Sequence, residues 1–198
     1  MDDDFQKHLK RSTVVCKMAN DYLIYKWKLW FGMFDSRGNG KVYKEDAREE
    51  EQLFAKLNHI ENAEEKKKVI KDLEAFWDAA VFQGKDGPIT EKEFVEAHVQ
   101  SYRVDKDAFI KKMETCYKTL FGSFDLLHEN MITCEEFING LKAFHHDDIT
   151  LEKTYFESYH PVDGKIPVKD LVESWVQFVT CNDSTQRDYV KEALENGL

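Results

Sequence analysis

Residues 113–144 read METCYKTLFGSFDLLHENMITCEEFINGLKAF, and the spacing of their apolar side chains decides the fold. The first part of this stretch carries an apolar residue every three or four positions, which is the period of one helix face. These residues are Met113, Tyr117, Leu120, Phe121 and Phe124. A polar segment follows with Ile132 as its central aliphatic residue, and a second apolar stripe begins at Phe137. The stretch therefore predicts a helix, a loop and a second helix.

The same pattern occurs three more times, around Val42, Ile89 and Ile166. One such unit cannot bury its own apolar stripes, so the first should pack on the second and the third on the fourth. In each pair the lone aliphatic residues should meet as two short antiparallel strands. We predict an all-α fold of four helix-loop-helix units, in two pairs packed into one compact body through their aromatic faces. The expected organisation is an N-terminal extension (1–20), a first pair (21–104) and a second pair with a C-terminal tail (105–198).

Composition narrows the classes of function. With 42% hydrophobic residues, the 198-residue chain can bury a substantial core. Its 38 acidic and 28 basic residues give a net charge of −10, which disfavours binding to a phosphate backbone. No apolar run approaches the roughly 18–20 residues that span a bilayer, and the four cysteines form no CxxC pair. We expect a cytoplasmic monomer with reduced cysteines, no membrane span and no nucleic-acid partner.

The four loops resemble those of the EF-hand superfamily. They are similar in particular to the loops of invertebrate sarcoplasmic calcium-binding proteins, whose relatives include calexcitins and calcium-regulated photoproteins. The twelve-residue loops are Asp35–Asp46, Phe82–Glu93, Asp125–Glu136 and Tyr159–Asp170, and the tail Phe178–Ser184 is similar as well. The resemblance implies four EF-hand-like units and a sarcoplasmic-type calcium-binding protein. Because its loops are degenerate, we expect calcium binding to be weak or absent, and the alternatives are a binder that favours magnesium or a metal-independent scaffold.

A calcium loop supplies oxygens from positions 1, 3, 5, 7, 9 and 12, with glycine at position 6. The second and fourth loops depart furthest from this pattern. Phe82 and Tyr159 stand at position 1, while Gly84 and Pro161 stand at position 3. Neither loop can surround a hard cation, so both are interpreted as degenerate.

The third loop is the best candidate for metal binding. Its remaining ligands are Asp125, Glu129, the carbonyl of Met131 and the bidentate Glu136. Leu127 occupies position 3, and Asn130 replaces the glycine at position 6, where an asparagine tolerates the left-handed conformation. The loop itself contains no cation. With one ligand lost, we expect calcium binding at the weak end of the EF-hand range.

The first loop is a weaker candidate. Its ligands would be Asp35, Asn39, the carbonyl of Lys41 and Asp46. An aspartate at position 12 favours magnesium over calcium, but Arg37 at position 3 opposes either ion because a guanidinium has no acceptor. Arg37 has the alternative of mimicking the ion by pairing with Asp35 or Asp46.

A second hypothesis comes from the many aromatic residues on the predicted inward faces. The simplest interpretation is a packed core, but the photoproteins and luciferin-binding relatives enclose an aromatic ligand with this fold. The chain would then be a carrier for an apolar or aromatic small molecule, with binding residues that the sequence does not identify. Polar groups for such a pocket would come from His98, Tyr102, Tyr117, Tyr155 or His160. No catalytic constellation is recognisable, which disfavours an enzyme.

Overall fold

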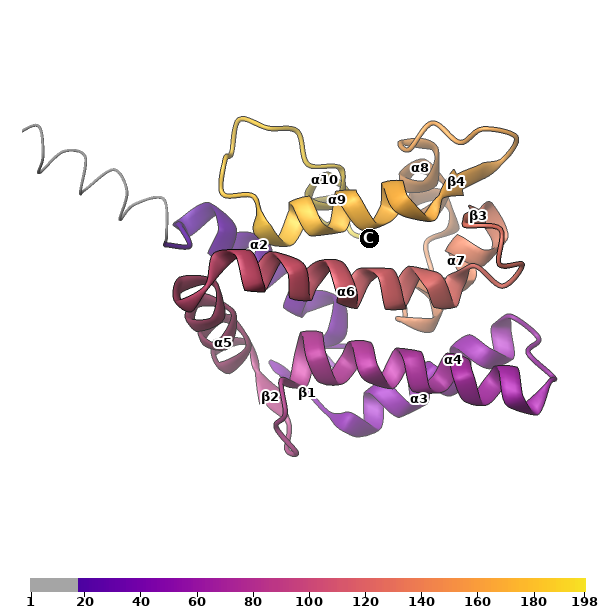
Figure 1. Ribbon diagram of the computed structural model, residues 1–198, viewed down its shortest axis with the longest axis horizontal. Helices are drawn as coiled ribbons and strands as arrows, with labels where there is room; N and C mark the ends of the chain where they lie inside the picture. The colour runs from indigo at the N-terminus through magenta and orange to yellow at the C-terminus, as the bar shows by residue number, and fades with distance from the viewer. Residues whose placement is uncertain (1–17) are drawn as a thin grey trace, which may run out of the picture.

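A computed structural model describes residues 18–198 and confirms the all-α fold (Figure 1). The first lobe contains α2 (Asp21–Phe34), β1 (Lys41–Val42), α3 (Lys44–Leu57), α4 (Ala63–Phe76), the π-helix η1 (Trp77–Phe82), β2 (Ile89–Thr90) and α5 (Glu91–Val104). The second lobe contains α6 (Lys106–Phe124), β3 (Met131–Thr133), α7 (Cys134–Ala143), α8 (Ile149–Glu157), β4 (Lys165–Pro167), α9 (Val168–Thr180) and α10 (Tyr189–Glu195).

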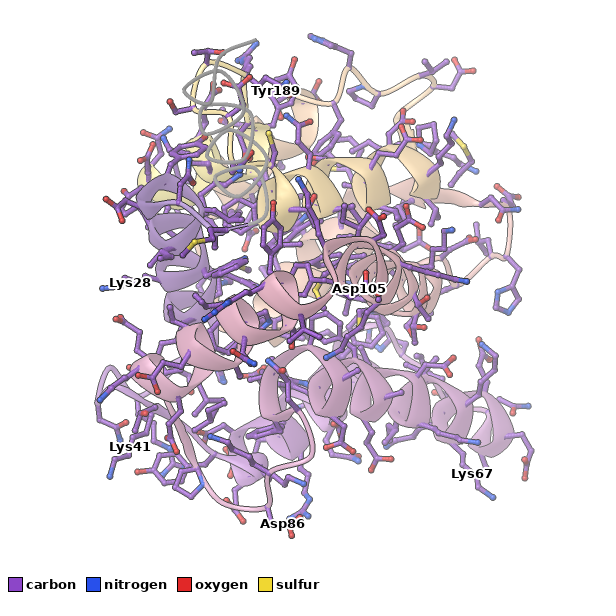
Figure 2. All side chains as sticks on the ribbon, turned by 60° about the vertical axis from the view of Figure 1, so that its left-hand side comes forward. Lys28, Lys41, Lys67, Asp86, Asp105 and Tyr189 are labelled. Carbon is purple, nitrogen blue, oxygen red and sulfur yellow. The ribbon has the colours of Figure 1, made fainter. Side chains whose placement is uncertain are left out.

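The loops pair as the lone aliphatic residues predict. Val42 lies opposite Ile89 in the antiparallel pair β1–β2, and Ile132 lies opposite Ile166 in β3–β4. All four side chains are fully buried. Figure 2 shows Lys41 and Asp86 on the two loops of the first pair, with Lys67 of α4 on the far side of that lobe. Each short sheet therefore holds one candidate metal loop next to one degenerate loop.

The two lobes share one aromatic core. Figure 1 shows α6 running between α9 and α4, and α6 packs against both. The ring of Trp30 lies 6.1 Å from that of Tyr117, and the rings of Phe54 and Phe124 stack at 5.2 Å. These contacts join the first lobe to the second and confirm the compact body that the aromatic stripes predict.

The entering helix of the second unit ends differently from the expectation. Its apolar stripe predicts a regular helix, but the last turn widens into η1. Gln83 then adopts a left-handed conformation with φ of 51°, and Phe82 is almost completely buried. The wider turn thus carries position 1 of the second loop into the core.

The C-terminal tail is fastened to α2 by buried polar contacts. Nζ of Lys26 lies 2.9 Å from Oδ2 of Asp188, and both side chains are buried. Trp27 Nε1 donates a hydrogen bond to the carbonyl of Val179 at 2.9 Å. Asp188 also caps α10 by accepting from the N–H of Lys191. These contacts hold α10 against α2.

Between residues 18 and 198, the structure contains no helix with the length and apolarity needed to cross a bilayer. Cys116, Cys134 and Cys181 are free thiols, as expected, and Cys16 lies outside the described residues.

Candidate functional site

The first and third loops share one backbone arrangement. In the first, the carboxylate of Asp35 accepts from the N–H groups of Asn39 (3.1 Å) and Gly40 (2.7 Å). In the third, Asp125 accepts from the N–H groups of Glu129 (3.0 Å) and Asn130 (2.8 Å). Asn130 has φ of 58°, so it takes the left-handed conformation that the sequence requires at position 6. The position-1 aspartates thus brace both loops from within.

Arg37 occupies the first loop as an internal cation. Its guanidinium pairs with Asp46 at position 12, with Nε at 2.8 Å from Oδ1, and lies 4.7 Å from the ring centroid of Tyr43. The hydrogen bond from Arg37 to Asp46 raises the pKa of the guanidinium further. Oδ2 of Asp46 also accepts from the N–H of Tyr43 at 3.3 Å. Of the two partners that the sequence allows, Arg37 therefore takes Asp46.

The third loop keeps its position-12 carboxylate free of cations. Oε1 of Glu136 accepts from the N–H of Leu126 at 3.2 Å. Oε2 accepts from the N–H and the hydroxyl of Thr133, both at 2.8 Å. Glu136 is buried, whereas Leu127 at position 3 is exposed and leaves the loop interior. A divalent ion would compete here with neutral donors only.

A cation nevertheless reaches the third loop from the fourth. Lys165 Nζ forms an ion pair with Oε2 of Glu129 at position 5, and this hydrogen bond raises the pKa of the ammonium. The contact follows from the strand register, because Lys165 lies opposite Thr133 in the β3–β4 pair. The expectation that no cation disturbs the third loop is therefore wrong for the folded pair. The predicted pairing of Ile132 with Ile166 already places Lys165 next to the third loop, a consequence that sequence reasoning missed.

The second loop also carries an internal ion pair. Lys85 Nζ lies 3.2 Å from Oε1 of Glu93 at position 12. Hydrogen bonds from the backbone and hydroxyl of Thr90, and then from Lys85, lower the pKa of Glu93 to about 2. Lysine or arginine thus contacts a ligand-position carboxylate in three of the loops.

The residues at position 1 of the degenerate loops, Phe82 and Tyr159, have structural roles. Phe82 contributes to the core, with its ring 6.0 Å from that of Trp77. The hydroxyl of Tyr159 lies 2.8 Å from that of Tyr155 and donates to Oγ of Ser174 at 2.9 Å. These side chains hold the loops to the helices without an ion.

The candidate carboxylate ligands of the first and third loops therefore make separate contacts with backbone N–H groups and basic side chains. Within residues 18–198, no three side chains of His, Cys, Asp or Glu are gathered in a metal-ligand arrangement. Ion binding in the third loop would require Glu129 to leave Lys165 and Glu136 to give up backbone hydrogen bonds.

A small cavity of about 30 Å³ lies at the junction of the lobes. Its lining includes Trp30, Tyr117, Tyr155 and Trp175 among phenylalanine, leucine and methionine side chains. Nε1 of Trp30 and the hydroxyl of Tyr117 are buried and have no hydrogen-bond partner among the described residues. Buried polar atoms are normally satisfied, so these two residues of the cavity lining each carry an unsatisfied hydrogen-bonding group.

The other polar groups suggested for such a pocket have different positions. His98 is fully buried, and Nδ1 lies 2.8 Å from the carbonyl of Phe94. Tyr102 donates to the carbonyl of Thr180 at 3.4 Å. Tyr155 lines the cavity, but its hydroxyl contacts Tyr159, and His160 is exposed. Sequence reasoning named Tyr117 and Tyr155 and missed the indole N–H of Trp30.

A buried carboxylate at the junction of the lobes is a further unusual feature. Both oxygens of Glu50 on α3 lack a hydrogen-bond partner among the described residues, and the side chain is buried. Nε2 of His145, just after α7, lies 3.9 Å from Oε1. Burial, followed by the charges of Asp46, Glu51 and Glu49, raises the pKa of Glu50 to about 9. Glu50 is therefore mainly protonated at neutral pH.

Comparison with known proteins places these features in context. A sarcoplasmic calcium-binding protein of Mizuhopecten yessoensis is 32% identical over 178 residues, covering 89% of this chain and 99% of that protein. The coelenterazine-binding protein of Renilla muelleri, in its calcium-loaded apo form, superposes with a TM-score of 0.66 at 18% identity, covering 88% and 93% of the two chains. The photoprotein mitrocomin of Mitrocoma cellularia gives 0.66 at 19% identity, covering 88% and 91%. These two structures share the fold of this chain. No protein-family model matches it.

Proposed function

The chain belongs to the sarcoplasmic calcium-binding protein family, and we propose that it is a member with weak calcium binding at the third loop only. The observation that carries this proposal is the set of internal ion pairs. Arg37 pairs with Asp46, and Lys85 pairs with Glu93, so cations of the chain hold position 12 of two loops. Glu136 is the remaining position-12 glutamate, and it contacts neutral donors.

The donor set of the third loop suits a hard divalent cation. Asp125, Glu129 and Glu136 are carboxylates, and the carbonyl of Met131 adds a neutral oxygen. Leu127 removes one ligand, and Lys165 competes for Glu129. We therefore expect a dissociation constant on the order of 10⁻⁴–10⁻³ M for calcium, the weak end of the EF-hand range. Magnesium would compete at the first loop, where Asp46 is the shorter position-12 ligand, but Arg37 opposes it.

Calorimetric titration of the metal-stripped protein with calcium tests this assignment. Glu136→Gln keeps the size of the side chain but removes the charge, and it should abolish the heat of binding. Asp35→Ala, which removes the position-1 ligand of the first loop, should leave that heat unchanged. A signal that survives Glu136→Gln and disappears with Asp35→Ala would place the ion in the first loop and overturn the assignment.

The second candidate function is a carrier of an apolar or aromatic molecule. The observation that favours it is that two residues lining the central cavity, Trp30 and Tyr117, carry buried polar groups without a hydrogen-bond partner among the described residues. However, pockets for small organic ligands usually occupy about 300–1,000 Å³, whereas this cavity has about 30 Å³. That space suits a water molecule with these two groups as partners, and a carrier would have to expand its core.

Coelenterazine is a suitable test compound because the Renilla muelleri protein is named for binding it. Tryptophan fluorescence should remain unchanged as coelenterazine is added, if the cavity stays closed. Saturable quenching that is lost in Tyr117→Phe would instead support the carrier function.

A further inference from the structure

A pocket of about 210 Å³ lies between α3, α4 and η1, and its lining includes no candidate ligand of the first or third loop. Three acidic side chains line it, Glu51 from α3, Glu74 from α4 and Asp78 from η1. Trp77 and Phe82 add aromatic surface to the same wall. The pocket thus combines negative charge with apolar rings.

Glu51 is the unusual member of this pocket. Its exposed fraction is only 3%, yet among the described residues it has no hydrogen-bond or ion-pair partner. Burial, followed by the nearby charge of Glu74, raises the pKa of its carboxyl group to about 7. Buried charges in proteins are normally paired. Glu51 therefore lacks a directly paired cation in the part of the chain that the structure describes.

Two basic side chains, Lys44 and Arg48, also line the pocket, and each already has an acidic partner. Lys44 Nζ lies 3.5 Å from Oδ1 of Asp78 and 3.6 Å from Oδ1 of Asp86. Arg48 forms its ion pair with Glu45 at 3.9 Å. Glu51 and Glu74 thus form no ion pair within the described part of the chain, and the nearby charge of Arg48 only opposes the rise in the pKa of Glu51.

The lining indicates the chemical class of the missing partner. No metal-ligand group of three His, Cys, Asp or Glu residues occurs in the described part of the chain, so the pocket lacks a set for a divalent metal. Lys44 Nζ already lies 5.5 Å from the ring centroid of Phe82, which places an ammonium group within cation–π range of this wall. We propose that the pocket binds an organic cation, an alkylammonium or guanidinium group, through the carboxylates of Glu51 and Glu74. Its volume suits one such group rather than a larger ligand.

This proposal has a pH signature. The groups around Glu51 are Lys44 and Arg48 on α3, Glu74 on α4 and Asp78 on η1. Among them Glu51 is the group that titrates near neutrality, at about 7. Its ionised fraction rises about tenfold between pH 6 and pH 8, so affinity for a permanently charged ligand should rise by a similar factor. Glu51→Gln should weaken binding at pH 8 by about tenfold and remove most of this dependence.

The experiment is a titration of the full chain, in chelator, with n-butylammonium or methylguanidinium chloride. NMR chemical shifts of the backbone N–H of Ala47 and of the backbone and indole N–H of Trp77, in ¹⁵N-labelled protein, report binding. A titration with sodium chloride at equal ionic strength is the reference. We expect saturable shifts at these residues at pH 8 that weaken about tenfold at pH 6. Absence of saturable shifts, or equal affinity at the two pH values, would overturn the proposal.

Matched variants locate the site. Glu49→Gln changes an exposed glutamate on the same helix and should leave the affinity unchanged, whereas Glu74→Gln should weaken it without a change in the core. Glu136→Gln should retain binding, which separates this pocket from calcium binding at the third loop. If calcium displaces the organic cation from the wild-type pocket at equal concentration, the site is a metal site and the proposal is wrong.

Discussion

The loops at 35–46 and 125–136 hold their position-1 aspartates in the same way. They differ in which ligand carboxylate forms an ion pair with a basic side chain. In the first loop, Arg37 reaches Asp46 from position 3 of the same loop. In the third, Lys165 comes from the neighbouring loop and reaches Glu129 at position 5. Asp46 is buried, whereas the side chain of Glu129 is half exposed. The first loop is therefore blocked at its position-12 carboxylate, which is buried. The third loop is blocked at position 5, at a half-exposed carboxylate where water can replace the lysine.

The two exiting helices differ as well, four residues after position 12. The third unit has Gly140 there, and the ring of Phe124 fills the space that a Cβ would need, with the nearest carbon only 2.0 Å away. The first unit has Glu50, a buried carboxyl group without a hydrogen-bond partner among the described residues. The helix after the first loop thus carries an electrostatic cost that the helix after the third loop avoids.

The largest effect that we predict is a change in the free energy of unfolding when the buried carboxyl group of Glu50 is removed. The folded pKa of Glu50 is raised to about 9, from an ordinary value of 4.5. Its contribution to stability is therefore complete below about pH 4.5 and is lost as the pH rises towards 9. Glu50→Gln stays neutral and should be more stable than the wild type by about 3 kcal/mol at pH 7. Urea unfolding at pH 5, 7 and 9 measures the difference.

The difference should be smallest at pH 5 and grow with pH. Glu45→Gln, a change at an exposed glutamate on the same helix, should show no such growth. An advantage of Glu50→Gln that is constant from pH 5 to pH 9 would mean that Glu50 does not titrate in this range.

The second prediction restores the blocked loop. Arg37→Asp removes the internal cation and supplies an oxygen ligand at position 3. Together with Asp35, Asn39 and Asp46, the loop then has oxygen ligands at positions 1, 3, 5 and 12. Calorimetry should detect a new calcium-binding event, at least about tenfold tighter than that of the third loop. Arg37→Met, which removes the charge without adding a ligand, should give a weaker event. If Arg37→Asp binds no calcium, the internal ion pair is not what blocks this loop.

The third prediction concerns the cation that crosses between loops. Lys165→Gln frees Glu129 from its ion pair and should strengthen calcium binding at the third loop by about two- to fivefold, as expected for an exposed pair. Lys169→Gln alters an exposed lysine nearby on α9 that pairs with Glu173 instead. It should leave the affinity unchanged. Equal effects of the two changes would reflect net charge rather than this contact.

Much of the fold could be predicted from the sequence because it depends on local periodicity. The spacing of aromatic residues determines which helix faces are buried, and the lone aliphatic residues determine the strand register. The register of Ile132 with Ile166 follows directly from this pattern. The π-helix could not be predicted in this way, because the burial of Phe82 depends on packing against Trp77 in three dimensions.

The ligand positions of the candidate loops could be read from the sequence, but not all of the basic side chains that pair with those ligands could. Arg37 was recognised because it lies inside its own loop, at a position that requires an acceptor. Lys165 was missed because it becomes a neighbour of Glu129 only when the two loops pair. Glu50 and Glu51 look like ordinary surface residues of a charged helix, and only the packing of α3 shows that both are buried.

The smallest predicted effect is that of removing calcium from the folded protein. EF-hands that need an ion to fold bring together carboxylates that repel one another in its absence. Here Arg37 and Lys165 supply positive charge at these ligands, and Phe82 and Tyr159 replace two position-1 carboxylates. With a dissociation constant on the order of 10⁻⁴ M or weaker, micromolar calcium stabilises the folded state by well under about 0.1 kcal/mol. Circular dichroism melts with and without EDTA should give the same Tm, whereas a large loss of helicity on chelation would show that the internal cations do not replace the ion.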